Sequence, residues 1–274
     1  MVFEESDILH EALIPSGPLG RYVERIFTLA PKAGERRLVD LPQGFSDIVF
    51  RAFGDGGSGF AKGDIHAVGA QPQAFDIPDP DVLATLVVRF RPGAAHPFFR
   101  VRMSELTDGV VPLQELWGAA ASELLHRLME ASATRSWLDV VESALNAQLE
   151  KAEAFRTSSA TAAALAAEAI ARPSEAQSVH AVADSLGLSE RHLLRQFQEA
   201  IGLGPKQYAR IARFQRAILM ASKADRPRWA ELSFEAGYCD QAHLIYDCQK
   251  LTGMSPTQFM LAWKCGRSGG VRSI

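Results

Sequence analysis

Cysteine is scarce in this sequence of 274 residues. Only three are present, Cys239, Cys248 and Cys265, and all of them lie near the C-terminal end. A low, odd number of cysteines gathered in one region does not build a disulfide framework, and free thiols are typical of proteins that work in a reducing compartment. We therefore expect a cytoplasmic protein whose fold depends on a packed core.

Long hydrophobic runs are also absent. No uninterrupted apolar stretch approaches the roughly 18 residues that a membrane-spanning helix needs. The start of the chain carries Glu4, Glu5 and Asp7, whereas a secretion signal begins with basic residues and an apolar run. We therefore expect neither a signal peptide nor a membrane partner. The hydrophobic content of 47% is sufficient for a buried core, and the length favours about two domains.

The sequence has no overall excess of basic residues, because its formal net charge is −3. The charge is nevertheless uneven: residues 1–150 contain 13 Lys and Arg against 21 Asp and Glu, whereas residues 173–274 contain 13 against nine. A basic C-terminal region behind an acidic N-terminal region is expected if only the C-terminal region contacts phosphate groups. Charge also fluctuates along chains that bind no nucleic acid, so this pattern decides little by itself.

The first 112 residues show the features of β-strands. The segments 21–29, 45–53 and 82–90 are rich in β-branched and aromatic residues. Clusters of glycine and proline separate these segments, which is typical of turns between strands. We predict a small β-barrel or sandwich for this region of the chain.

Helical periodicity replaces the strand pattern after residue 112. Apolar residues recur at helical spacing in 113–129 and 136–149, which predicts a helical pair, and the alanine-rich segment 157–172 predicts a further helix. Pro173 ends that helix. The sequence therefore predicts an α+β protein. Its expected regions are a β-rich, barrel-like domain that ends in helices (1–156), a helical linker (157–172), an all-α domain (173–264) and a flexible tail (265–274).

The last hundred residues contain an internal repeat. The segment 186–189 aligns with 236–240 so that Gly187 matches Gly237 at an offset of 50, and one inserted residue then changes the offset to 51. Five pairs match at the new offset: Ser189 with Asp240, Leu193 with Leu244, Gly202 with Gly253, Pro205 with Pro256 and Tyr208 with Phe259. A coherent register on both sides of one insertion indicates two copies of one supersecondary unit.

Each copy has the features of two short helices joined by a tight turn. Gly187 and Gly237 permit the left-handed conformation that ends the first helix. Ser189 and Asp240 then cap the second helix. Two helices joined in this way make a helix-turn-helix. A long helix from about Pro205 to Ser222 is expected to join the two copies.

The second helix of each copy is the one expected to enter a DNA major groove. Its buried side is predicted to hold Leu193, Leu194 and Phe197 in the first copy, and Leu244, Cys248 and Leu251 in the second. Its other side offers hydrogen-bonding groups for bases and phosphates. The candidate DNA-binding residues are Ser189, Arg191, His192, Arg195 and Gln196 in the first copy, and Gln241, Ala242, His243, Ile245 and Tyr246 in the second, where Asp247 and Gln249 share the face. Solvated charged faces are common in helical domains, but the repeat, the caps and the basic first face together favour DNA.

The C-terminal third of the sequence resembles the AraC/XylS family of regulators. The matching segments are 182–189, 193–197, 204–208, 213–217, 236–238, 240–244 and 253–256. The resemblance implies that Arg191, Leu194 and Arg195 read bases from the first helix, and that Ala242, Ile245 and Tyr246 do so from the second. It also implies that the two helices occupy successive major grooves on one face of the DNA. The N-terminal region, around Arg89 to Gly93, looks like the sensing domain of one branch of the family.

Three positions of the second copy depart from that branch. Residues 246 and 249 are usually basic and are Tyr and Gln here, while residue 248 is usually aromatic and is Cys248 here. The smaller side chain predicts an underpacked motif, at a cost of about 1–3 kcal/mol unless a neighbour such as Phe234 fills the space. Fewer positive charges predict weaker attraction to phosphates. The second motif is therefore expected to bind weakly or to serve mainly as a scaffold.

Two local patterns suggest other chemistry but lack the context it needs. Residues 54–59 satisfy the G-x-G-x-x-G pattern of a nucleotide-binding loop, yet residues 60–66 predict a strand where that loop needs a helix. Cys239, His243 and Asp247 are spaced by four residues, but Cys239 precedes the helix cap and does not share the helix face. We therefore expect a hairpin at 54–59 and no metal site. A redox switch through Cys239 and Cys248 stays open, although an inward Cys248 is expected to be unreactive.

Catalytic signatures are also missing. No nucleophile elbow and no Cys/His catalytic signature is present, and His66 and His96 are more readily explained as structural residues than as ligands. We therefore expect no cofactor and no enzymatic activity.

The sequence thus predicts a bacterial-type transcription regulator. Residues 1–156 are expected to sense a small ligand or to mediate dimerisation, and residues 173–264 are expected to bind a promoter. Expected partners are double-stranded DNA, a small-molecule effector, RNA polymerase and a second copy of the chain. The alternative is a small-molecule-binding or enzymatic β-barrel whose helical tail has lost DNA binding. The sequence does not identify the ligand-binding residues, the operator or the direction of regulation.

Overall fold

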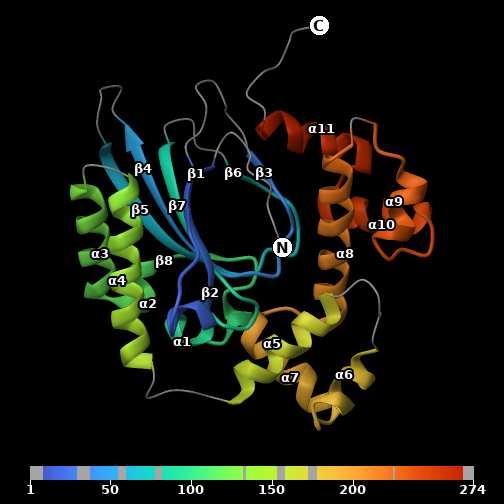
Figure 1. The fold of residues 1–274 in the computed structure, drawn as a ribbon, viewed down its shortest axis with the longest axis horizontal. Coiled ribbons are helices and arrows are strands. Elements are labelled where there is room, and N and C mark those ends of the chain that lie inside the picture. The colour runs from blue at the N-terminus through green and yellow to red at the C-terminus, as the bar shows by residue number, and fades with distance from the viewer. Residues whose placement is uncertain are drawn as a thin grey trace, which may run out of the picture.

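The computed structural model of the protein describes residues 9–29, 38–54, 60–77, 82–131, 134–152, 158–171, 178–224 and 226–267. A β-rich region comes first in the chain, and a helical region follows and packs beside it (Figure 1). The predicted α+β class is therefore confirmed. Among the helices of the described residues, none is both long and apolar enough to cross a membrane.

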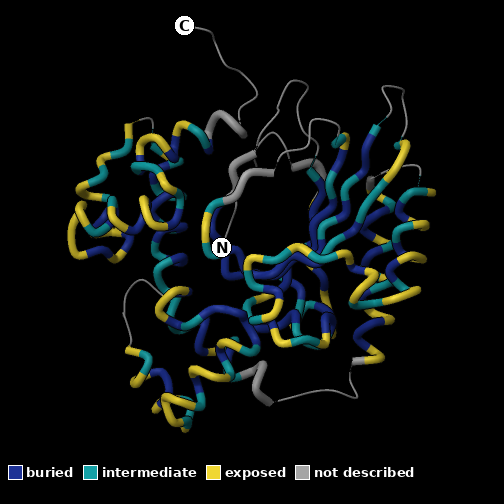
Figure 2. The backbone as a smooth tube through the Cα atoms, turned by 180° about the vertical axis from the view of Figure 1, so that it is seen from behind, coloured by how far each residue is buried: buried dark blue, intermediate teal, exposed yellow. Residues whose placement is uncertain are grey.

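A six-stranded antiparallel sheet forms the first region. Its strands lie in the order β1 (Leu9–Leu13), β2 (Val23–Leu29), β7 (Val82–Phe90), β4 (Asp47–Gly54), β5 (Phe60–Val68) and β8 (Val110–Pro112). The three predicted strand segments correspond to β2, β7 and β4, which are neighbours in the sheet and largely buried (Figure 2). A separate two-stranded sheet pairs β3 (Leu38–Asp40) with β6 (Phe75–Ile77).

The large sheet is open, so the barrel-like prediction was too specific. Its edges are β1 and β8, and the described strands show no pairing that would join these edges into a barrel. The alternation of apolar and polar residues along a strand indicates which side chains are buried on one face of the sheet. It does not report whether the edges of the sheet meet, which depends on strand number, tilt and stagger.

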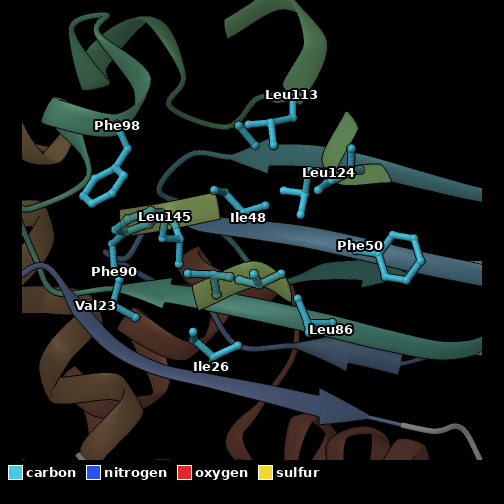
Figure 3. Packing of buried hydrophobic residues seen from close by; sticks show 14 of the residues in the cluster. Val23, Ile26, Ile48, Phe50, Leu86, Phe90, Phe98, Leu113, Leu124 and Leu145 are labelled. Carbon is cyan, nitrogen blue, oxygen red and sulfur yellow. The ribbon is translucent and has the colours of Figure 1, made fainter. Parts of the chain in front are cut away.

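Helices cover one face of this sheet. They are α1 (His96–Phe99), α2 (Leu113–Trp117), α3 (Ala119–Glu130) and α4 (Thr134–Ala152), with single 3-10 turns η1 (Leu19–Arg21) and η2 (Met103–Glu105). Ile48, Phe50 and Leu86 of the sheet lie in one buried cluster with Leu124 of α3 and Leu145 of α4 (Figure 3). The predicted helix 113–129 is interrupted at Gly118, whose φ of 58° and ψ of −132° separate α2 from α3.

Seven helices form the described C-terminal region. They are α5 (Ser158–Ala171), α6 (Val179–Ser185), α7 (Glu190–Ile201), α8 (Pro205–Ser222), α9 (Trp229–Glu235), α10 (Gln241–Thr252) and α11 (Pro256–Arg267). The long helix α8 has the bounds that the sequence predicts, and α7 and α10 lie toward its two ends (Figure 1). Arg216 of α8 donates to the carbonyl oxygens of Ala171 and Ala236, and so ties the C-terminal ends of α5 and α9 together.

The segment predicted as a linker is the helix α5, and it packs against α7 and α8. Ala166 and Ala167 are buried in the cluster that also holds Phe197 and Phe214. We therefore propose that α5 is counted with the C-terminal domain, while the other predicted boundaries stay predictions.

The two regions of the chain share a buried boundary. Leu41 and Ala70 of the β-rich region belong to the same buried cluster as Tyr208 of α8. Hydrogen bonds between described residues cross this boundary from Thr107 Oγ1 to the Gly202 oxygen at 2.8 Å, from Gln215 Nε2 to the Pro42 oxygen at 2.8 Å, and from Ala74 N to the Leu251 oxygen at 2.8 Å. The β-rich region therefore contacts the ends of α7 and α10 as well as the helix between them.

Candidate nucleic-acid interface

The first helix-turn-helix is formed by α6 and α7. Ser178 Oγ accepts a hydrogen bond from Ala181 N at 3.1 Å, and Ser189 Oγ accepts one from His192 N at 3.3 Å, so each helix begins with a side-chain cap. Gly187 in the turn has a φ of 67°, and Gly202 after α7 has a φ of 91°. Only glycine adopts these left-handed values readily, which explains why the turn and the end of the helix fall at these residues.

The exposed face of α7 is cationic at its N-terminal half. Arg191 and Arg195 are exposed, and His192 is half-buried between them. Arg195 Nη2 lies 3.4 Å from His192 Nδ1, and these three residues line one depression together with Ser189. Guanidinium groups form paired hydrogen bonds with guanine or phosphate oxygens. The depression therefore has the chemistry of a DNA-contacting surface.

Leu194 and Gln196 of α7 differ in burial from what the sequence predicts. Leu194 was expected on the buried side together with Leu193 and Phe197, but its exposed fraction is 40%, whereas the other two are 0% exposed. The buried prediction was wrong for Leu194, because it lies on the solvent side of the helix. Gln196 is half-buried, and its Oε1 atom is out of contact with solvent and without a hydrogen bond from any described residue.

The second helix-turn-helix is formed by α9 and α10 and repeats the same local geometry. Gly237 has a φ of 91° and Gly253 a φ of 72°. Asp240 Oδ1 accepts a hydrogen bond from His243 N at 2.7 Å, which caps α10. Ser255 and Gln258 exchange hydrogen bonds at the start of α11, as in a capping box. The predicted repeat is therefore visible in the caps and turns of both copies.

The exposed face of α10 differs from that of α7 in charge. Gln241, Ala242 and Tyr246 are exposed, and His243 and Ile245 are half-buried. None of these five predicted contact residues is Lys or Arg. The second face therefore offers polar and aromatic contacts, but lacks the two guanidinium groups that α7 presents.

The burial of Asp247 also differs from the prediction. It was placed on the solvent face of α10, but its exposed fraction is only 1%. Its carboxylate lies 3.2 Å from Arg210 Nε and 3.5 Å from Arg213 Nη2, both on α8. A buried charge needs such partners. The sequence feature that could have indicated this burial is the pair Arg210 and Arg213, which lie three residues apart on the neighbouring helix.

Cys248 lies inward, as predicted, and is 0% exposed. Its Sγ atom is 3.7 Å from Thr252 Oγ1, and burial raises the pKa of its thiol from 9.0 to about 11. Phe234, a neighbour considered for filling the space beside this small side chain, is 64% exposed. Cys239 is exposed, so the two thiols lie in different environments.

Other sequence patterns fall outside the recognition helices. Residues 55–59 of the glycine-rich stretch lie outside the described residues, but β4 and β5 on either side pair as an antiparallel hairpin, where a nucleotide-binding loop needs a helix. His66 Nδ1 lies 3.4 Å from Asp64 Oδ1. No group of three His, Cys, Asp or Glu side chains suited to a metal ion occurs among the described residues.

Two segments of the chain match known protein families. Residues 182–262 match the family described as "Helix-turn-helix domain", and residues 11–112 match the family described as "Domain of unknown function (DUF6597)". No curated protein shows a significant match to the chain.

Several solved structures are similar to the chain at low identity. ToxT from Vibrio cholerae with a bound unsaturated fatty acid is 8% identical, covers 99% of this chain and 100% of that chain, and gives a TM-score of 0.45. A transcriptional regulator with an AraC-type DNA-binding domain from Chromobacterium violaceum is 18% identical, with coverages of 40% and 96% and a TM-score of 0.35. The DNA-binding domain of AdpA in complex with a target DNA is 23% identical, with coverages of 42% and 100% and a TM-score of 0.35.

The helix-turn-helix family match and the residues themselves identify the C-terminal domain. The matched residues 182–262 contain both capped motifs and the segments that resemble the AraC/XylS proteins. These residues, which are about a third of the chain, form a helix-turn-helix domain of the AraC type.

Proposed function

We propose that the protein reads a promoter site with α7 and α10 together, and that α7 supplies most of the affinity. The observation that carries this proposal is the depression formed by Ser189, Arg191, His192 and Arg195 at the start of α7. Two exposed guanidinium groups on one recognition helix suit a guanine edge or the phosphate backbone. The corresponding face of α10 carries no such group, so it contributes base contacts with little attraction to phosphates.

The proposal is tested by selecting binding sites for the full chain from a pool of random DNA and titrating the best site with salt. A DNA-reading regulator enriches one sequence, and its log affinity falls linearly with log salt at a slope of about −0.9 for each neutralised phosphate. Enrichment of no sequence would contradict the proposal. That outcome would favour the alternative of a ligand-binding or enzymatic β-rich domain with a helical tail that no longer binds DNA.

We also propose that a small ligand bound to the N-terminal domain modulates this binding. The support is the shared boundary, because Thr107, Pro42 and Ala74 hydrogen-bond to the C-terminal region near α7, at α8 and at the end of α10. A change in the sheet domain therefore reaches both recognition helices through direct contacts. The half-buried Arg51 and Asp64 alternate along their strands with core residues, so they lie on the sheet face opposite the helices. They form an ion pair with each other at 2.6 Å, and this pair is the polar group that we propose for contact with an effector.

Ligand modulation has its own test. A library of small polar metabolites is screened by thermal shift of the full chain, and each compound that stabilises it is added to the DNA-binding assay. A compound that raises the unfolding temperature and changes DNA affinity supports the proposal. If no compound changes either quantity, the N-terminal domain has a role other than sensing, and dimerisation is then measured by sedimentation.

A further inference from the structure

The second recognition helix contains a buried carboxylate that is only partly satisfied. Asp247 is 1% exposed, and Arg210 and Arg213 approach it from α8 at 3.2 and 3.5 Å. Arg213 approaches its Oδ2 atom, but this atom accepts no hydrogen bond from any residue that the structure describes. A buried carboxylate oxygen without a hydrogen bond costs stability, so native proteins usually provide a donor for it.

His243 is the neighbouring donor. It lies one helical turn before Asp247, and its Nε2 atom is 3.8 Å from Asp247 Oδ2. A side-chain shift of less than about 1 Å brings this pair to hydrogen-bond distance. The ring of Tyr238 packs edge-on against the imidazole, with centroids 5.1 Å apart and planes at 85°, and so holds the plane of the ring. The groups that face His243 are therefore Asp247 on its own helix, Tyr238 in the turn, and Arg210 and Arg213 on α8 beyond the carboxylate.

A hydrogen bond between these two atoms would determine which ring nitrogen of His243 is left as an acceptor. A neutral imidazole has one N–H donor and one acceptor, and an ionised carboxylate only accepts. When Nε2 donates to Asp247 it carries the hydrogen, and Nδ1 is then the acceptor. The side chain of His243 is 36% exposed on the face of α10 that is expected to meet DNA. In the major groove, the donors that such an acceptor can meet are the amino groups of adenine and cytosine.

We propose that Asp247 is a positioning residue that fixes His243 as a hydrogen-bond acceptor, so that α10 selects an amino base over a keto base at one position of one DNA strand. This inference rests on the proposed DNA-reading function. It gives the weakly charged second motif a role in specificity, since a base contact of this kind discriminates between sequences without adding attraction to phosphates.

The test uses the full chain at about pH 8, above the ordinary titration range of imidazole. Binding sites are first selected from random DNA. In the half of the selected DNA site that α10 is proposed to contact, each base pair is then inverted in turn, for example from A·T to T·A. The inversion moves the amino group to the other strand and keeps the base composition. The wild type is expected to lose about 5- to 100-fold in affinity when one particular pair is inverted. His243→Phe removes the acceptor, and is expected to bind both orientations of that pair within twofold while keeping its other preferences.

Asp247→Asn distinguishes positioning from a merely structural role. The amide oxygen of asparagine is expected to face the arginines, and its N–H₂ group then donates to Nε2, which leaves Nδ1–H as a donor. The preference at that one pair is therefore expected to disappear or to reverse toward the keto base. His126→Phe, a change at an exposed histidine of α3 in the sheet domain, is the control and keeps the preference for the amino base.

Three results bear on the inference in different ways. If Asp247→Asn weakens binding to all sequences equally and keeps the preference for the amino base, Asp247 is structural and the inference is wrong. If Asp247→Asn does not fold, His243→Phe decides, because an unchanged preference in that variant also overturns the inference. Wild-type binding without any sequence preference would contradict the proposed function itself, which is a separate outcome.

Discussion

Single residues in α10 and in the turn before it determine how the stability of the second motif responds to pH. Burial raises the pKa of Cys248 from 9.0 to about 11 and also raises the pKa of Tyr238, to which the nearby Asp247 carboxylate contributes. Each folded-state pKa lies above its unfolded-state value, so the folded chain holds these protons more firmly than the unfolded chain does. The stabilisation is complete below about pH 9 and is lost as the pH rises.

We therefore expect the unfolding free energy of the protein to fall between about pH 9 and pH 11. Cys248→Ala removes one of the titrating groups, so its unfolding free energy is expected to fall less steeply over this range, although the variant is less stable at pH 7 because of the cavity. Urea unfolding at several pH values gives both slopes. Equal slopes for the variant and the wild type would show that the Cys248 thiol is not protected by the fold.

For single residues, the spacing of apolar residues in the sequence predicted burial well, whereas the burial of polar residues was predicted wrongly. Periodicity identified Leu244, Cys248 and Leu251 as inward residues, and all three are buried. The same reasoning placed Asp247 in solvent, because burial of a charge depends on partners from another helix. It also placed Leu194 in the core, because an apolar residue beside Leu193 was counted with it although the two point to different sides of α7.

Among the elements, the N-terminal caps define where the recognition helices begin. Asp240 accepts the hydrogen bond from His243 N at 2.7 Å, and so satisfies one of the free N–H groups at the start of α10. Asp240→Ala is expected to lower the unfolding free energy by about 1 kcal/mol, within the usual range of roughly 0.5–2 kcal/mol for caps. Asp240→Asn keeps a hydrogen-bond acceptor at the same place, so we expect it to lower the unfolding free energy by only a small fraction of that amount.

Chemical unfolding of the two cap variants tests this prediction. An Asp240→Ala protein as stable as the wild type would show that the cap does not hold α10 in solution. Equal losses in Asp240→Ala and Asp240→Asn would show that the charge near the helix N-terminus matters more than the hydrogen bond.

The elements of the C-terminal region could be predicted closely, and those of the sheet only partially. Caps and glycine turns mark both ends of α7 and α10, and Pro205 marks the start of α8, so the bounds of these helices agree with the prediction within a residue or two. Strands β3, β6 and β8 have only three residues each, which is too short for an alternating pattern to stand out. The break at Gly118 was missed because an isolated glycine within a helical pattern is often tolerated.

The whole molecule depends on the boundary between its two domains. Gly44 lies against the ring of Tyr208 on α8, and a Cβ atom added at Gly44 would come within 2.5 Å of two ring carbons. Gly44→Ala is therefore expected to push the domains apart and to destabilise the protein by about 1–3 kcal/mol, as overpacking of a tight contact does. Gly204→Ala is the matched control, because a Cβ atom there has no neighbour within 4 Å.

Thermal unfolding and limited proteolysis of these two variants measure the effect. We expect Gly44→Ala to unfold at a lower temperature and to be cleaved faster between the domains, while Gly204→Ala behaves as the wild type. Identical behaviour of the two variants would mean that the sheet domain does not hold the helical domain through this contact in solution. The proposed route from a ligand to the recognition helices would then need another path.

The most direct test of the central claim compares Arg195→Ala with Arg127→Ala in binding to the selected DNA site. Both changes remove one exposed arginine, but Arg195 lies on α7 and Arg127 on α3 of the sheet domain. We predict that Arg195→Ala lowers affinity for the selected site by about 5- to 150-fold and relaxes the preference over random DNA, while Arg127→Ala changes neither quantity. Equal affinities for the two variants, or a wild type that binds its selected site no more tightly than random DNA, would contradict the claim that α7 reads DNA.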